Sequence, residues 1–236
     1  MWTPPWRRPT CSVTAGTDVV WAGELTPAQC SRFPAGDFVG RGSFATAYAH
    51  VRSPKKVVKF TADENDARAA NALRGKRLLG TVTVFDVARL KGQSAEGVVH
   101  GANLRSTGRR AGRPVFAVVT ERVDPVVSSE WRTAMDVLGR VVHDNRERLS
   151  AAKGGAGFSI PFDVVGSAED QCAGSGCRDR VRELVSALNE AGRAGIILTD
   201  VYAKNWGMRG ERPVVLDFGI SKQERRKKIR LAKAPG

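Results

Sequence analysis

Alternating apolar and polar residues dominate the first half of the chain. The segment "DFVGRGSFATAYAHV", which begins at Asp37, alternates until the turn-forming "SPKK", and the short apolar run "VVKF" follows. Two further segments, "TVTVFDVARL" and "PVFAVVTERV", have the same strand-like character. A period of two residues between turn formers is typical of strands, so this half is predicted to form a sheet.

Helical periodicity occurs once within this half and then dominates the second half. Segment 61–80, "TADENDARAANALRGKRLLG", has acids at its start, alanines in its middle and basic residues at its end, as expected for one helix. Segments 128–149 and 178–196 place apolar residues on one helical face. These positions are Trp131, Met135, Leu138 and Val142 in the first segment, and Val181, Leu184, Val185 and Leu188 in the second.

The order of these elements predicts an α+β protein of two lobes, with a boundary near residues 123–125. The glycine- and serine-rich stretch 151–176 is predicted to be a long loop or insertion, and "NWGM" and "PVVLDFG" are predicted to form a closing hairpin. We expect four parts along the chain. They are an irregular N-terminal extension, 1–36, with a short helix after Thr26-Pro27, a first lobe, 37–123, a second lobe, 124–221, and a basic tail, 222–236.

The formal net charge of +14 is unevenly placed along the chain. The segment from Ser221 to Gly236 carries seven basic residues against the single acid Glu224, and a second basic run lies between Leu104 and Pro114. Such runs are most often solvated helix ends or arms. They also suit contact with a polyanion such as nucleic acid, and we keep both interpretations open.

The four cysteines do not predict a metal site, because Cys172 and Cys177 form the only close pair and no second pair stands at zinc spacing. The first residues lack the apolar core of a signal peptide. No run of about 18 apolar residues occurs, so no membrane contact is expected. These features favour a reducing, cytoplasmic location.

Three polar residues near the end of the chain have spacing suited to phosphoryl-transfer chemistry. Asp200 is followed five residues later by Asn205, and Asp217 comes twelve residues after that, in "VVLDFG". The Asn205 amide oxygen and the Asp217 carboxylate are predicted to bind a divalent cation, while Asp200 faces a substrate hydroxyl. Each residue alone has an ordinary alternative, since Asp200 and Asp217 are also typical of caps and turns.

A candidate phosphate-binding segment lies upstream, in "FVGRGSFATAY". Gly40 and Gly42 allow backbone N–H groups to approach phosphate oxygens, and Ala45 stands where a third glycine would be expected. Lys59 follows in the middle of the apolar run "VVKF", where its charge requires an anion or solvent. A simple hairpin turn and an edge-strand lysine are the alternatives for the two features.

In this order, the motifs "GRGSFATAY", "VVKF", "TERV", "LTDVYAKN" and "LDFG" resemble those of the protein kinase family. The resemblance covers residues 37–221, with a weak match between Ser150 and Arg178. It implies a two-lobed fold with an N-terminal antiparallel sheet plus one helix and a reduced, mainly helical C-terminal lobe. It also implies ATP and Mg²⁺ as cofactors and a Ser/Thr hydroxyl as acceptor.

The resemblance implies roles for individual residues. Asp200 would orient or deprotonate the acceptor, Lys59 would contact the α- and β-phosphates, and Lys204 would approach the transferred phosphate. Asn205 and Asp217 would bind Mg²⁺. The remaining nucleotide contacts would come from Gly40, Gly42, Ser43 and Phe44 over the phosphates, from Val39, Val57 and Leu216 around adenine, from the backbone of Glu121 and Val123 at its edge, and from Thr120 behind it.

The chain also departs from the family pattern. Leu198 and Thr199 replace the His and Arg that usually precede the catalytic Asp, so control by a phosphorylated activation loop is not expected. Tyr202 replaces the usual lysine two residues after that Asp. Glu64 and Asp66 both compete to pair with Lys59, and we favour Glu64 for its longer reach. Few residues follow Gly219, so the expected kinase core is a minimal one.

Three functions remain open from the sequence. The first is an ATP- and Mg²⁺-dependent kinase that acts on Ser or Thr in proteins. The second is a kinase of small molecules such as aminoglycosides or sugars. The third is an inactive pseudokinase that binds nucleic acid or an assembly partner through its basic surface. Retention of Lys59, Asp200, Asn205 and Asp217 favours an enzyme over the third.

Overall fold

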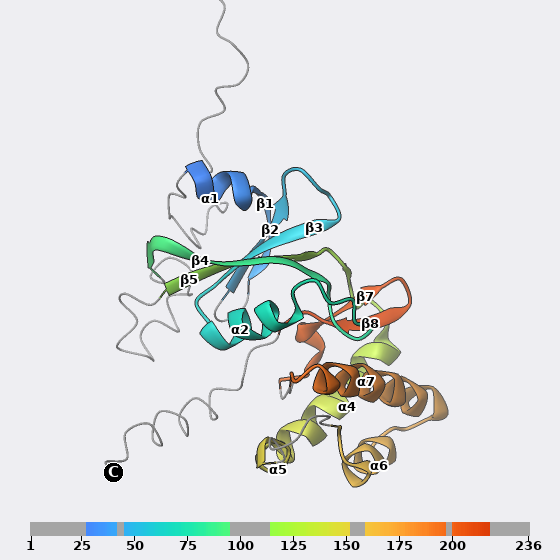
Figure 1. The fold of residues 1–236 in the computed structure, drawn as a ribbon. Helices are drawn as coiled ribbons and strands as arrows, with labels where there is room; N and C mark the ends of the chain where they lie inside the picture. The colour runs from blue at the N-terminus through green and yellow to red at the C-terminus, as the bar shows by residue number, and fades with distance from the viewer. Residues whose placement is uncertain (1–26, 42–44, 95–113, 152–158, 197–199, 218–236) are drawn as a thin grey trace, which may run out of the picture. The chain divides into compact units, whose positions relative to one another are not determined.

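The computed structural model describes residues 27–41, 45–94, 114–151, 159–196 and 200–217 (Figure 1). These residues form antiparallel sheets and helices, which confirms the α+β class and the N-terminal antiparallel sheet. No helix within these ranges combines the length and apolar character needed to cross a membrane. Segments 1–26, 95–113 and 218–236, with most of the predicted extension, the basic loop and the basic tail, lie outside the described residues.

The chain divides into two compact units. The first comprises Met1–Ala67 and Val84–Arg122, and the second comprises Arg68–Thr83 and Val123–Gly236. Each unit is described by itself below. The predicted two-lobed arrangement and the predicted domain limits stay predictions.

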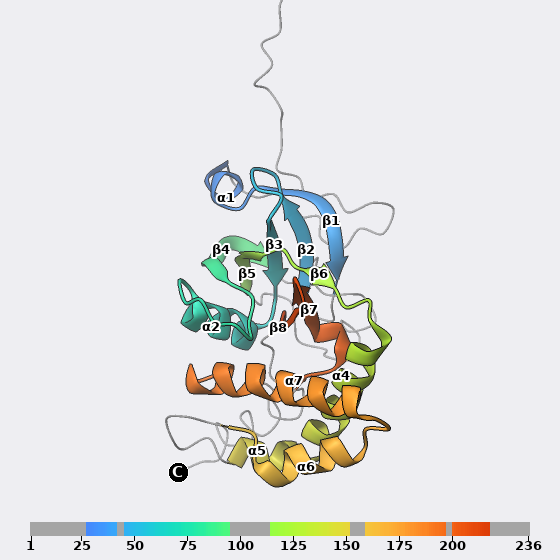
Figure 2. The ribbon, with the colours of Figure 1, turned by 90° about the vertical axis from the view of Figure 1, so that its right-hand side faces the viewer.

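A five-stranded antiparallel sheet forms the first unit, with strand order β1-β2-β3-β5-β4 (Figures 1 and 2). The first three strands pair antiparallel in chain order, and the predicted strand segments are confirmed. The bounds are β1 Ala35–Arg41, β2 Ala45–His50, β3 Lys56–Thr61, β4 Val84–Ser94 and β5 Pro114–Glu121. Helix α1 is Pro27–Arg32, and helix α2, Glu64–Leu73, begins in this unit.

One face of this sheet carries an apolar core. Tyr48 on β2 lies opposite Val58 on β3, which lies opposite Val119 on β5, and all three are buried. Phe33, directly after α1, is buried in the same core. Residues 27–34, which the sequence places in the N-terminal extension, therefore contribute to the core, and the short helix predicted there is confirmed. Burial raises the pKa of Tyr48 to about 12.

Alternation along the strands places a different set of side chains on the other face. Lys59 on β3 lies opposite Ala47 on β2 and Val118 on β5, and Val57 lies opposite Thr120. Since side chains two positions apart share a face, Lys59, Val57 and Thr120 belong together. The sheet thus separates an aromatic core from a face that carries a lysine among small and apolar side chains.

Helices make up most of the second unit. α7, Ser175–Arg193, packs against α4, Ser129–Asp144, and against α6, Phe162–Asp170 (Figure 2). The predicted apolar stripes are confirmed, because all eight listed positions of α4 and α7 are buried. The remaining elements are α5 Arg146–Ala151, the short 3-10 helix η2 Ala203–Asn205, and the antiparallel sheet of β6 Asp124–Pro125, β7 Trp206–Arg209 and β8 Arg212–Val215.

The stretch 151–176, predicted to be a loop, contains helix α6. Its Val164 and Ala168 are one helical turn apart and buried, so they pack the helix against its neighbours. The glycines and serines around this pair make the helical pattern hard to recognise in the sequence. Cys172 and Cys177 form a disulfide between α6 and α7. Disulfides are uncommon in reducing compartments, so this pair does not support the predicted reducing, cytoplasmic location, which stays a prediction.

The helix predicted over residues 61–80 ends early, at Leu73. Gly75 has a φ of +77°, a backbone conformation that stops the helix. The following loop is held by hydrogen bonds inside the second unit. The Arg209 guanidinium donates to the carbonyls of Leu78 and Thr81 at 3.2 and 2.8 Å, and the Gly80 amide donates to Glu190 Oε2 at 2.6 Å.

Gly80→Ala is expected to destabilise the second unit. An added Cβ at Gly80 would lie 2.4 Å from the Cα of Ala187 on α7, where only backbone movement could relieve the overlap. Overpacking of this kind costs about 1–3 kcal/mol. Thermal unfolding followed by the fluorescence of Trp131 and Trp206, both buried in this unit, measures the effect.

Gly166→Ala is the matched control, because nothing lies within 4 Å of the added Cβ and the residue is helical. It should leave the melting temperature unchanged or raise it slightly. Equal melting temperatures for the Gly80 and Gly166 variants would contradict the close packing of the loop on α7.

Candidate functional site

A lysine and an aspartate form a nearly buried ion pair in the first unit. Lys59 Nζ lies 2.9 Å from Asp66 Oδ2, and their side chains are 16% and 3% exposed. Lys59 comes from the middle of β3 and Asp66 from the first turn of α2, which begins after Asp63 accepts a hydrogen bond from the amide of Asn65 at 3.0 Å. The helix therefore orients the lysine on the sheet face that carries Val57 and Thr120.

The preference for Glu64 as partner of Lys59 is corrected by this ion pair. Asp66, Ala70 and Leu73 are buried at helical spacing, so they form the inner face of α2, whereas Glu64 is exposed. Helical phase, rather than side-chain length, decides which acid reaches the lysine.

The glycine-rich segment includes the end of β1 and the start of β2, which pair antiparallel. Gly40 lies opposite Ala47 and Arg41 opposite Thr46, with irregular pairing before Gly40. Gly42, Ser43 and Phe44, predicted to cover phosphates, lie outside the described residues. Val39, predicted to contact adenine, is 45% exposed on β1.

The other predicted adenine-binding residues fall in both units. Val57, Thr120 and Glu121 lie on β3 and β5 of the first unit. Val123 and Leu216 belong to the second unit, where they meet over Gly207. A Cβ at Gly207 would lie 2.5 Å from Val123 Cγ2 and 3.2 Å from Leu216 Cδ2, so the glycine leaves room for both side chains.

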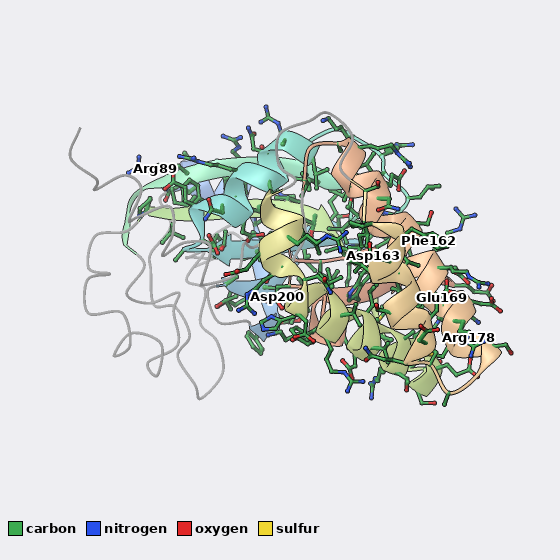
Figure 3. All side chains as sticks on the ribbon, turned by 90° about the horizontal axis from the view of Figure 1, so that it is seen from below. Arg89, Phe162, Asp163, Glu169, Arg178 and Asp200 are labelled. Atoms are coloured by element: carbon green, nitrogen blue, oxygen red, sulfur yellow. A yellow bond between two sulfur atoms is a disulfide. The ribbon has the colours of Figure 1, made fainter. Side chains whose placement is uncertain are left out.

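Asn205 connects the segments of the candidate metal site in the second unit. The side-chain Nδ2 of Asn205 donates to the backbone carbonyl of Asp200 at 2.6 Å. The backbone carbonyl of Asn205 accepts from the backbone N–H of Leu216 at 2.8 Å. Asp217 follows Leu216 directly and is partly exposed, as is Asp200, which Figure 3 labels. The structure thus brings together the three segments that carry Asp200, Asn205 and Asp217.

The chemistry of these groups fits a hard divalent cation. The hydrogen bond to the Asp200 carbonyl uses the Nδ2 of Asn205. The Oδ1 of the same amide is then the atom that would bind a cation, and Asp217 adds carboxylate oxygens. Within the described residues, no group of three or more His, Cys, Asp or Glu side chains could hold a metal ion. A magnesium ion that takes one or two protein oxygens, with phosphate and water completing its shell, does not need such a group.

Trp206 and helix α4 pack against the loop between Asp200 and Asn205. Trp206 is 3% exposed and its Nε1 donates to the carbonyl of Val201 at 2.8 Å, so its ring packs inside the second unit. Tyr202 lies against Gly139 of α4, and Lys204 is exposed. Leu198 and Thr199 lie outside the described residues.

Sequence patterns missed the contacts of Tyr202 with α4. The Tyr202 ring lies beside His143, with ring centroids 6.2 Å apart, and His143 in turn contacts Arg146. The only local signal was Gly139 in the middle of a helical segment, which is typical of close packing.

Comparisons with known proteins give a weak structural likeness. No protein-family model matches the chain, and no curated protein matches it. Among solved structures, the chain is similar to the one titled "Crystal structure of M.tuberculosis PknI kinase domain", with a TM-score of 0.39 and 14% sequence identity. The match covers 80% of this chain and 59% of that chain, so the chain spans less than two thirds of that kinase domain.

Proposed function

We propose that the chain is an ATP- and Mg²⁺-dependent phosphotransferase that transfers the γ-phosphoryl group to Ser or Thr hydroxyls of proteins. The observation that carries the proposal is the hydrogen-bonded arrangement around Asn205, which joins Asp200 to the residue before Asp217. One acid for an acceptor and an Asn–Asp pair for a cation form the set that phosphoryl transfer requires.

The Lys59–Asp66 pair supports the same chemistry from the first unit. A lysine on an apolar sheet face, held by a 3% exposed carboxylate, is a fixed positive charge suited to the phosphates of a nucleotide. Fixed charges of this kind stabilise the developing charge of the transferred group without reorganisation.

The proposed transfer breaks one bond to phosphorus and forms another. The bond between the γ-phosphorus and the β,γ-bridging oxygen of ATP breaks, and a bond forms between that phosphorus and the acceptor hydroxyl oxygen. The hydroxyl proton passes to the Asp200 carboxylate, and the products are ADP and a phosphomonoester. When bound, Mg²⁺ would neutralise phosphate charge, with Asn205 and Asp217 as its protein ligands.

Asp217→Asn is expected to raise the Mg²⁺ concentration needed for half-maximal ATP binding by about tenfold or more, because one ligand loses its charge. Titration of a fluorescent ATP analogue at increasing Mg²⁺ measures the shift.

Asp170→Asn removes the same charge from an exposed position at the end of α6 and serves as the control. Its Mg²⁺ dependence should match that of the unaltered protein. An Asp217 variant that behaves like this control would overturn the metal-binding role.

A further inference from the structure

Arg146 is a partly buried cation without a described anionic partner. It begins α5, and its Nη1 contacts the ring Nε2 of His143 and lies 3.4 Å from the His143 carbonyl. Its Nε is buried and has no hydrogen-bond acceptor in the part of the chain that the structure describes. The partners that the structure shows for Arg146 are therefore an imidazole nitrogen and a backbone carbonyl, and neither is a carboxylate.

Other arginines of the same unit are paired with carboxylates. Arg148 pairs with Asp163, and Arg182 pairs with Glu169 at 2.8 Å, two acids labelled in Figure 3. Arg180 pairs with Glu183 at 3.0 Å. All three ion pairs are at least partly exposed, where pairing contributes little. Arg146, which is partly buried and gains more from an anion, has none among the described residues.

The position of Arg146 links it to the loop that carries Asp200. His143 lies between Arg146 and Tyr202, whose ring centroid is 6.2 Å from that of His143. Gly139 makes this possible, because a Cβ there would lie 2.9 Å from Tyr202 Cδ1. Tyr202 is two residues from Asp200, and the exposed Lys204 follows on the same loop. A chain of contacts from Arg146 through His143 to Tyr202 therefore connects this cation to the loop that carries Asp200.

We propose that Arg146, together with His143 and Tyr202, binds an acidic side chain of the acceptor peptide next to the hydroxyl that faces Asp200. This rests on the proposed function and adds a substrate class to it. Arg146 is only partly buried, and a carboxylate that reaches its guanidinium would form a charge-assisted hydrogen bond, which is stronger than a hydrogen bond to a neutral acceptor. The single charge of one guanidinium matches the single charge of a carboxylate.

Two serine peptides that differ only in Glu or Gln at positions flanking the serine test this inference. Arg146→Gln is expected to raise KM for the Glu peptide by about tenfold, the loss of one charge-assisted contact, while kcat and the KM for the Gln peptide stay unchanged. Arg146→Lys should retain a preference for the Glu peptide, because it keeps the charge. Arg140→Gln is the matched control, since Arg140 is exposed on α4 and lies one turn before His143.

Equal losses in the Arg146 and Arg140 variants would overturn the inference, because they would show general electrostatic attraction. Equal KM values of the unaltered protein for the two peptides would also overturn it.

Binding of the fluorescently labelled peptides without ATP separates this inference from the proposed function. If no peptide is phosphorylated but the Glu peptide binds more weakly to the Arg146→Gln variant, the acidic-peptide site stands and the proposed function fails. If phosphorylation occurs and both peptides bind all variants alike, the site is overturned and the proposed function stands. If Arg146→Gln does not fold, binding of the Glu and Gln peptides to the unaltered protein decides the inference, because equal affinities would overturn it.

Discussion

Replacing Asp200 by asparagine is expected to lower phosphoryl transfer by about 10²–10⁴-fold, the range that a positioned general base contributes, while ATP binding is retained. Asparagine keeps the size of the side chain and cannot accept the acceptor proton. The backbone carbonyl of residue 200, which holds Asn205, is also kept. Steady-state transfer of labelled phosphate and titration of a fluorescent ATP analogue measure the two quantities.

Asp136→Asn is the control, because it removes the same charge from an exposed position on α4. Its transfer rate should stay within a factor of about two of the unaltered protein, as for most surface substitutions. An Asp200 variant with full activity would show that another group takes the proton.

Asp66→Asn is expected to destabilise the pairing of α2 with β3 by about 3 kcal/mol, because it leaves a charged lysine without its carboxylate. We expect the lower end of the range for broken buried pairs, since the Lys59 side chain keeps 16% exposure. Transfer activity should fall as well, because Lys59 loses its orientation. Hydrogen exchange of the backbone amides of β3 and α2 measures the local change directly.

Glu64→Gln provides the comparison that decides between the two acids. Glu64 is exposed at the start of α2, so the substitution should cost less than about 1 kcal/mol. If the Glu64 variant exchanged as fast as the Asp66 variant, the ion pair with Asp66 would not be the main support of Lys59.

The elements of the fold were largely predictable because their signals are local. Alternation identified β2 to β5, and stripes such as Trp131 and Met135 identified α4. The end of α2 was predicted several residues too late, because alanines and basic residues favour a helix whereas the positive φ of Gly75 is visible only in the structure. Helix α6 was missed since its two buried apolar residues stand among glycines and serines.

The sequence predicted the candidate site only through the spacing of Asp200, Asn205 and Asp217. The five-residue spacing of Asp200 and Asn205 predicted that the two residues act at one site, and the hydrogen bonds of Asn205 bring their segments together. The choice between Glu64 and Asp66 needed helical phase, and the sequence contained that signal in the helical spacing of Asp66, Ala70 and Leu73. Arg146 could not be predicted, because its link to Tyr202 depends on tertiary packing through His143.

Transfer of label from γ-labelled ATP to a serine-containing protein or peptide tests the central claim most directly. We expect Mg²⁺-dependent incorporation into serine or threonine with the unaltered protein, no incorporation after chelation of the metal, and a loss of about 10²–10⁴-fold with Asp200→Asn. Folded protein that transfers no phosphate from ATP at any Mg²⁺ concentration, or transfers it equally well with Asp200→Asn, would contradict the account.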